Sequence, residues 1–257
     1  MSTGERVEYV RALDRGLAVL QAFSRERPAM TLADVARSTN LTRATARRLL
    51  LTLVELGYLQ LDGREFRLTP KVLNIGYAYL SSLDLARLAQ PAMEALAEYT
   101  HESCSAAVLD GTEIVYVARV PAKRILTISL GLGSRLPAYA TSMGRVLLAG
   151  LAPAQLDRTL ATCSFEALTP KTLVDPAAVR EELDRVRRQG WALVDQELEL
   201  GLRSIAAPLR NRPGCAVAAL NVSTHASRVD PDQLHGEFLP ALLETAARIT
   251  EGLASRF

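Results

Sequence analysis

The chain has 257 residues, of which 49% are hydrophobic and 23% charged, as in soluble globular proteins with one or two cores. Its longest apolar runs, such as residues 216–220, fall far short of the roughly 20 residues of a membrane helix. The first ten residues lack the apolar stretch of a secretory signal, and three cysteines without a C-x-x-C pair exclude a disulfide framework. We therefore expect a cytoplasmic protein with no membrane contact, no metal site and no cofactor.

The net charge of +2 is unevenly distributed along the chain. Residues 1–70 carry 11 Lys and Arg against 8 Asp and Glu, whereas the remaining residues carry 19 against 20. No acidic residue occurs between Asp34 and Glu55, a stretch that contains four arginines. Such a patch on a nearly neutral protein indicates a small module for an anionic partner, although solvated arginines on a helix face would look the same.

The first 70 residues predict three helices followed by a hairpin. Residues 12–23 are amphipathic with helical spacing, Thr31 is placed to cap a second short helix, and Thr42 is placed to cap a third over residues 43–56. Two alternating segments then flank Asp62-Gly63, a strong signal for a β-hairpin.

This order of elements is typical of a winged helix-turn-helix, which we predict for residues 1–70. The first residues of the third helix would enter the major groove of double-stranded DNA, where Arg43 and Arg47 read base edges. Arg48 and the hairpin arginines would contact phosphates. The alternative is a generic three-helix bundle with a basic surface. The predicted DNA-binding residues are Thr31, Thr42, Arg43, Thr45, Arg47, Arg48, Arg64 and Arg67.

The rest of the chain predicts a linker helix over residues 71–84 and an α+β domain over residues 85–257. The expected strands are 105–109, 113–120, 125–130, 192–194, 205–209 and 216–223. The expected helices are 85–99, 142–151, 176–189 and 231–254.

No catalytic motif is found in this second part. A G-x-S-x-G elbow, a P-loop, H-E-x-x-H and G-x-G-x-x-G are all absent from the sequence. His101 and Cys104 are close in sequence and could form a nucleophilic pair, but a cysteine that only packs in a strand is the more common case, and the same holds for Cys215.

A small-molecule site is predicted at residues 133–143, a loop that leads into a helix. Free backbone N–H groups and the helix dipole at Ser142 and Met143 suit a carboxylate, and Gly144 would allow its close approach.

Several separated motifs resemble the IclR (isocitrate lyase regulator) family of bacterial transcription factors. They are residues 13–20 (LDRGLAVL), 31–36 (TLADVA), 42–50 (TRATARRLL), 136–145 (LPAYATSMGR) and 201–208 (GLRSIAAP). The resemblance covers nearly the whole chain and is nearest to the branch that controls aromatic catabolism through the β-ketoadipate pathway.

The resemblance implies an effector-binding domain of the GAF-like type, with the effector at the loop before residue 144. It adds Asp195, Ser204, Asn221 and Ser223 as effector contacts. Because two carboxylates repel, Asp195 should either accept a hydrogen bond from a ligand hydroxyl or pair with a cation such as Arg203. Asn221 and Ser223 are two residues apart and should face the same side of their strand. Some relatives have Ser and Cys where this chain has Asn221 and Ser204, so their effectors do not transfer.

The resemblance further implies dimer contacts on the linker helix and dimers that pair into tetramers. A single module reads only a short half-site, so at least a homodimer on a palindromic operator is expected. The sequence thus predicts a transcriptional regulator that responds to a small aromatic or ring-cleavage acid, with RNA polymerase left open as a further partner. The alternatives are an α+β enzyme fused to a DNA-binding module and an interaction-only scaffold.

Overall fold

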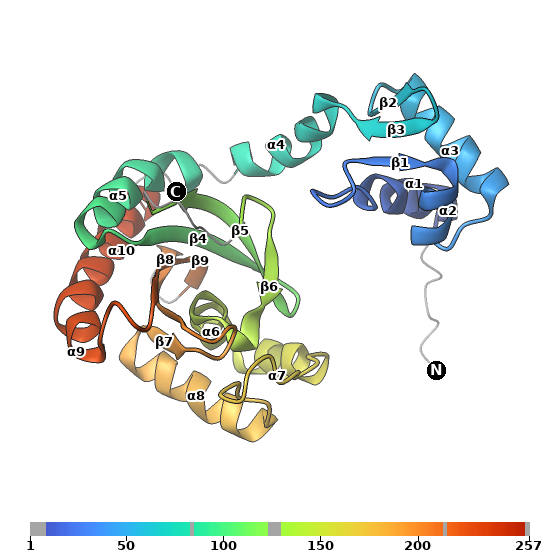
Figure 1. The fold of residues 1–257 in the computed structure, drawn as a ribbon. Coiled ribbons are helices and arrows are strands. Elements are labelled where there is room, and N and C mark those ends of the chain that lie inside the picture. The colour runs from blue at the N-terminus through green and yellow to red at the C-terminus, as the bar shows by residue number, and fades with distance from the viewer. Residues whose placement is uncertain (1–8, 83–84, 123–129, 213–214, 255–257) are drawn as a thin grey trace. The chain divides into compact units, whose positions relative to one another are not determined.

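The computed structural model describes residues 9–82, 85–122, 130–212 and 215–254. The chain divides into two compact units, residues 1–82 and 83–257, which are described separately (Figure 1). None of the helices in the described residues is both long and apolar enough to cross a membrane.

The first unit is a helix-turn-helix with a wing, as predicted. Its elements are α1 (Arg11–Gln21), β1 (Ala29–Thr31), α2 (Leu32–Ser38), α3 (Arg43–Glu55), β2 (Leu59–Asp62), β3 (Glu65–Leu68), η1 (Pro70–Val72) and α4 (Leu73–Ser82). The strand β1, only three residues long, was not predicted; it pairs with β3 and gives the sheet order β1-β3-β2.

Local side-chain chemistry sets the ends of these elements. Thr31 and Asp34 form a capping box at the start of α2, and the Thr42 hydroxyl accepts from the Thr45 backbone N–H at the start of α3. Gly63 has φ of 58°, the left-handed conformation that a tight hairpin turn requires. The three helices and the sheet enclose one core, formed by Val19, Phe23, Met30, Val35, Leu50, Leu53, Leu59 and Phe66.

The second unit is an α+β domain built on a six-stranded antiparallel sheet, also as predicted. The strands, β4 (Ser103–Asp110), β5 (Glu113–Val120), β6 (Arg135–Pro137), β7 (Ala192–Asp195), β8 (Leu202–Arg212) and β9 (Cys215–His225), lie in the order β6-β5-β4-β9-β8-β7. The helical elements are α5 (Leu85–Thr100), η2 (Ala138–Ala140), α6 (Ser142–Ala149), α7 (Pro153–Ala161), α8 (Pro176–Gln189), α9 (Pro231–Gln233), the π-helical η3 (Leu234–Phe238) and α10 (Leu239–Ala254).

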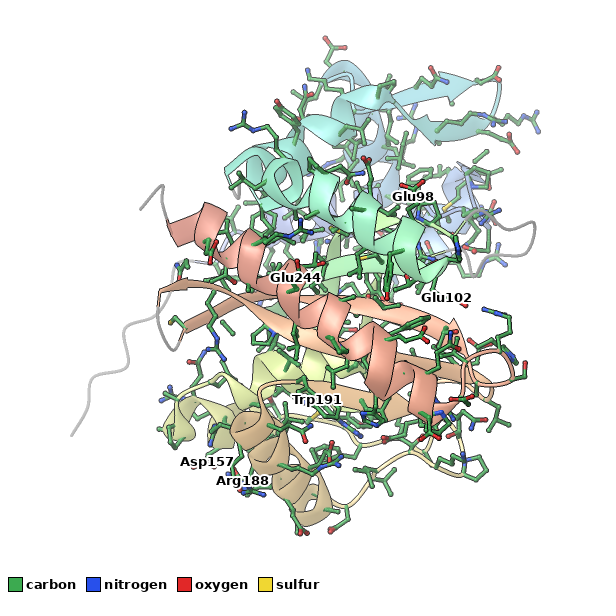
Figure 2. All side chains as sticks on the ribbon, turned by 90° about the vertical axis from the view of Figure 1, so that its left-hand side faces the viewer. Glu98, Glu102, Asp157, Arg188, Trp191 and Glu244 are labelled. Carbon is green, nitrogen blue, oxygen red and sulfur yellow. The ribbon has the colours of Figure 1, made fainter. Side chains whose placement is uncertain are left out.

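Helices cover both faces of this sheet. In Figure 2, α5 and α10, which carry Glu98 and Glu244, lie side by side across one face. On the other face α6 packs against β4, β8 and β9, and α8 packs against α6. The expected strand at residues 125–130 lies largely outside the described residues, and the short β6 and the helix α7 were not predicted.

Strand register gathers polar side chains on the α6 side of the sheet. Ser103 on β4 pairs with Ser223 on β9, which pairs with Ser204 on β8, and Ser105 pairs with Asn221. Because alternate residues of a strand face opposite sides, these five polar residues share one face.

Candidate ligand cavity and nucleic-acid interface

A cavity of about 260 Å³ lies between the start of α6 and the polar face of the sheet. The described lining residues are Glu102, Ser103, Tyr116, Arg119, Ala122, Leu130, Ala140, Thr141, Ser142, Met143, Val194, Leu198, Glu199, Leu200, Leu202, Ser204, Asn221, Ser223, Thr224, His225 and Arg228. Ligand pockets typically measure roughly 300–1,000 Å³, so this cavity lies just below that range and suits a ligand at its small end.

The N-terminus of α6 forms one wall of the cavity. The Thr141 hydroxyl accepts from the Gly144 N–H at 3.2 Å and caps the helix. Ser142 and Met143 occupy the first two helical positions, whose N–H groups have no acceptor within a helix. The Ser142 and Ser204 hydroxyls are hydrogen-bonded to each other at 2.8 Å, which joins the start of α6 to β8.

Five of the seven predicted effector contacts come together in the cavity wall. They are Ser142, Met143, Ser204, Asn221 and Ser223. The other two, Gly144 and Asp195, are not among the described lining residues.

Gly144 is placed for packing rather than for ligand contact. A Cβ at this position would lie 2.1 Å from the carbonyl oxygen of Ala138 and 2.3 Å from its Cα. The glycine therefore lets α6 lie directly against the backbone of η2. The space in which a ligand was predicted to approach Gly144 is occupied on its Cβ side by the backbone of Ala138.

Asp195 is held in a salt bridge at the edge of the sheet. Its carboxylate accepts from Arg203 Nε at 2.9 Å and Nη2 at 3.2 Å, and Lys171 Nζ lies 3.8 Å away. The hydrogen bonds from Arg203 hold the pKa of Asp195 below its ordinary value. Gln196 Nε2 also donates to this carboxylate at 3.4 Å, so protein groups already surround it, with Arg203 as the expected cation.

Charged residues that the sequence analysis did not select also line the cavity. Glu102 is buried and accepts from Arg228 at 3.2 Å and from the Thr224 hydroxyl at 2.9 Å. Arg119 extends from β5, and His225 belongs to the same wall. The available signal for Arg119 was an arginine in an otherwise apolar strand end, Val117–Val120.

Tyr116 was also missed. It is buried in the cavity wall, and this burial raises the pKa of its phenol, which therefore stays neutral.

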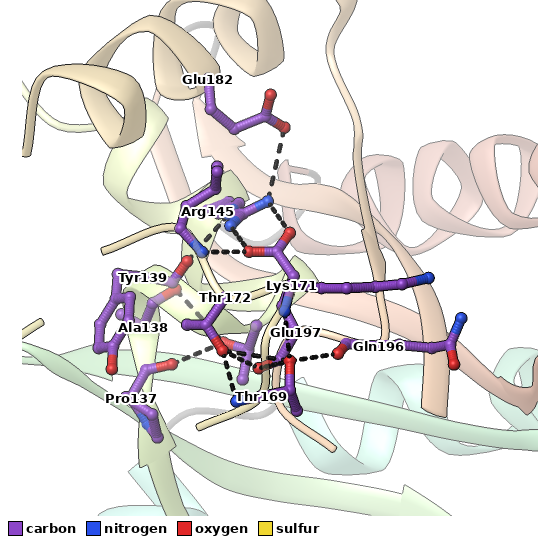
Figure 3. Close-up of polar contacts among 12 residues, drawn as sticks. Pro137, Ala138, Tyr139, Arg145, Thr169, Lys171, Thr172, Glu182, Gln196 and Glu197 are labelled. Carbon is purple, nitrogen blue, oxygen red and sulfur yellow. Dashed lines mark hydrogen bonds and ion pairs between the residues drawn. The ribbon is translucent and has the colours of Figure 1, made fainter. Parts of the chain in front are cut away.

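A buried ion pair links α6 to the segment that leads into lining residues 198–200 (Figure 3). Arg145, 1% exposed, donates to Glu197 Oε1 at 2.7 Å and Oε2 at 2.5 Å and to the Tyr139 carbonyl at 2.9 Å. Glu182 lies 3.7 Å from the same guanidinium. Glu197 directly precedes the lining residues 198–200, so the pair anchors them to α6. The sequence signal was a lone arginine in an apolar helix.

Cys104 does not have the environment of a catalytic nucleophile, and the described residues form no metal centre. Cys104 is fully buried, and burial raises the pKa of its thiol to about 12, so the reactive thiolate does not form at neutral pH. No group of three or more His, Cys, Asp or Glu among them is arranged to hold a metal ion.

The predicted DNA-binding residues divide between exposed and engaged side chains. Arg43, Arg47 and Arg48 are exposed on α3, and Arg64 is exposed at the tip of the hairpin. Arg67 is half-buried and pairs with Glu65 at 3.0 Å.

The threonines are engaged within the unit. The Thr31 hydroxyl is bonded to Asp34 in the capping box. The Thr42 hydroxyl donates to Thr45 Oγ1 at 3.0 Å.

The first unit is a winged helix-turn-helix with exposed arginines, and the second is an α+β domain with a small cavity. Together on one chain, these two units are typical of a ligand-responsive DNA-binding regulator. Residues 12–63 match the model of the IclR helix-turn-helix domain, and residues 77–251 match that of the bacterial transcriptional regulator IclR C-terminal domain. The chain belongs to the IclR family of transcriptional regulators.

Individual relatives narrow the comparison. The chain is 46% identical over 237 residues to the Pca regulon regulatory protein of Pseudomonas putida, covering 92% of this chain and 81% of the relative. It is 40% identical over 244 residues to the p-hydroxybenzoate hydroxylase transcriptional activator of Acinetobacter baylyi, covering 93% and 90%. An IclR homolog from Microbacterium hydrocarbonoxydans, crystallised with 4-hydroxybenzoate, has a TM-score of 0.84 at 26% identity, covering 95% of this chain and 99% of that one.

Proposed function

We propose that this regulator controls genes of aromatic-acid catabolism by binding a palindromic operator and responding to a small aromatic carboxylate. The observation that carries the proposal is the polar cavity at the start of α6, on a chain that also holds a DNA-binding unit. The names of the two curated relatives and the 4-hydroxybenzoate bound to the structural neighbour support the class of effector.

The carboxylate is assigned to the N-terminus of α6. The N–H groups of Ser142 and Met143 and the positive end of the helix dipole favour an anion there. The hydroxyls of Ser142 and Ser204 bond to each other, so together they add one further hydrogen-bond donor at this end of the helix. The ring would lie against the apolar lining residues, including Leu130, Met143 and Leu198.

The variant Asp195→Asn tests whether Asp195 contacts the ligand. Asp195→Asn should leave the affinity for 4-hydroxybenzoate unchanged, because the carboxylate is committed to Arg203 and does not line the cavity. The free energy of unfolding at pH 7 should fall by at most about 1 kcal/mol, since the pair is partly exposed.

The pH dependence of this loss follows from the lowered pKa of Asp195. A carboxyl with a lower pKa in the folded state stabilises the protein above its unfolded pKa, and this contribution disappears as the pH falls through the folded value. In urea denaturation the gap in free energy of unfolding between wild type and Asp195→Asn should therefore persist from pH 7 to about pH 4 and narrow only at lower pH, toward the lowered pKa of Asp195. A tenfold loss of 4-hydroxybenzoate affinity in calorimetry would instead place Asp195 at the ligand.

DNA recognition is assigned to Arg43 and Arg47 for base edges and to Arg48, Arg64 and Arg67 for phosphates. Arg43→Ala should weaken binding to a specific site, selected from a random DNA library, by about 1–3 kcal/mol. The affinity of the variant for random DNA should be nearly that of the wild type. Arg64→Ala should weaken both and lower the salt slope by about 1.

These affinities are measured by fluorescence anisotropy, with Arg158→Ala as the control because it removes an exposed arginine from the other unit. Equal losses on selected and random DNA for Arg43→Ala would contradict base readout by this residue.

Assembly into at least a dimer is proposed from the first unit. Large apolar side chains are exposed on α1 and α4, with Leu13 64% and Leu73 71% exposed, and Leu17, Ile75 and Tyr77 also exposed. A second copy of the chain would cover them and supply the second half-site reader; the resemblance extends this to pairs of dimers. Light scattering of the full chain with DNA at micromolar concentration should give a dimer or tetramer, and a monomer would contradict the proposal.

A further inference from the structure

A row of three polar side chains runs across the cavity-facing side of the sheet, and none of the three is assigned to the carboxylate. Ser105 on β4 pairs in register with Arg119 on β5 and with Asn221 on β9. Residues directly opposite on neighbouring antiparallel strands share one face, so the three side chains form a row. Both ends of the row, Arg119 and Asn221, line the cavity.

Asn221 presents an acceptor that the protein does not use. The residue is 3% exposed, and its Nδ2 donates to the Ser223 hydroxyl at 2.9 Å. Its Oδ1 has no hydrogen-bond partner among the described residues. A buried amide oxygen without a donor is unfavourable, so this position is complementary to a ligand group that carries a proton.

Arg119 presents a cation that no described acid neutralises. Its Nη1 lies 3.4 Å from the Ser105 hydroxyl oxygen, which brings the guanidinium from β5 over β4, toward the strand that carries Asn221. The other arginine of the wall, Arg228, is already paired with Glu102. The guanidinium of Arg119 has only donors to offer and is complementary to an acceptor.

A hydroxyl satisfies both ends of the row, because its proton is donated to Asn221 Oδ1 while its oxygen accepts from Arg119. A carboxylate has no proton for Asn221, and a ring C–H serves neither residue. We propose that Arg119 and Asn221 are the specificity-determining pair of the cavity and select hydroxylated aromatic monocarboxylic acids over unsubstituted acids and over dicarboxylates. This inference rests on the proposed effector function.

The test is calorimetric titration of the full-length protein with benzoate, 3-hydroxybenzoate, 4-hydroxybenzoate and terephthalate. The better of the two hydroxy acids should bind at least about tenfold tighter than benzoate and tighter than terephthalate, because a site built for a hydroxyl penalises ligands that lack one. In Asn221→Leu and in Arg119→Met this preference should drop to about twofold or less through weaker binding of the hydroxy acid. Asn211→Leu is the matched control, since Asn211 on β8 also has a buried Oδ1 with no partner among the described residues but is not among the lining residues.

The outcomes separate this inference from the function on which it rests. If the wild type binds benzoate as tightly as both hydroxy acids, or binds terephthalate more tightly, the inference is overturned without any variant. The assignment of the carboxylate to α6 would still hold. A hydroxyl preference that persists in folded Asn221→Leu and Arg119→Met would overturn the assignment to these residues. No binding of any of the four acids would overturn the inference together with the proposed aromatic effector.

Discussion

Replacing Arg145 by methionine is expected to lower the free energy of unfolding by about 3–5 kcal/mol, because the change leaves the carboxylate of Glu197 buried without its cation. Both members of the pair are at least nine-tenths buried, and the guanidinium also satisfies the Tyr139 carbonyl. The loss is measured by urea denaturation at pH 7. Affinity for 4-hydroxybenzoate should fall in the same variant, since Glu197 leads into the lining residues 198–200.

Two controls identify the cause of this loss. Arg135→Met removes an arginine whose partners, Asp110 and Glu113, are exposed, and should cost only about 0–1 kcal/mol. Adding Glu197→Gln to Arg145→Met should recover part of the stability, because the second change removes the uncompensated charge. A loss below about 1 kcal/mol for Arg145→Met would show that the pair does not hold the domain together.

Gly144→Ala is expected to lower the free energy of unfolding by about 3 kcal/mol, at the upper end of the usual cost of overpacking. The new Cβ meets the backbone of Ala138 at 2.1 Å, and backbone cannot move aside as a flexible side chain does. Since the start of α6 must shift, binding of 4-hydroxybenzoate should weaken with stability. This substitution therefore does not isolate a contact with the carboxylate.

Gly236→Ala is the matched control for this prediction. Its added Cβ would meet no atom within 4 Å, and the residue has no positive φ. The change should be neutral or slightly stabilising, by up to about 1 kcal/mol. Similar unfolding curves for Gly144→Ala and Gly236→Ala would show that α6 can move away from η2 at little cost.

Local signals explain why so much of the first unit could be predicted from sequence. The caps at Thr31 and Thr42 and the turn at Gly63 each act within a few residues, so they set element boundaries without help from the rest of the fold. The strand β1 was not predicted, because its pairing with β3 joins residues more than thirty positions apart and its own three residues show no strand pattern.

In the cavity, spacing along one strand was informative and pairing between strands was not. Asn221 and Ser223 are two apart, and both line the cavity as the strand period requires. Arg203 was one of two expected partners of Asp195, and the choice between them follows from the register that sets these two residues opposite each other. Arg145 and Glu197 are 52 residues apart, so their pairing follows only from the packing of α6 against the segment that holds Glu197.

The most direct test of effector-controlled DNA binding is the affinity of the full-length protein for its selected DNA site, measured by fluorescence anisotropy with and without saturating acid. The acid used is the tightest binder among benzoate, 3-hydroxybenzoate and 4-hydroxybenzoate. The predicted result is a change of at least about tenfold in the DNA dissociation constant, equal to about 1.4 kcal/mol of coupling, with the same factor in acid affinity when DNA is bound. An unchanged DNA dissociation constant at saturating acid would contradict the account.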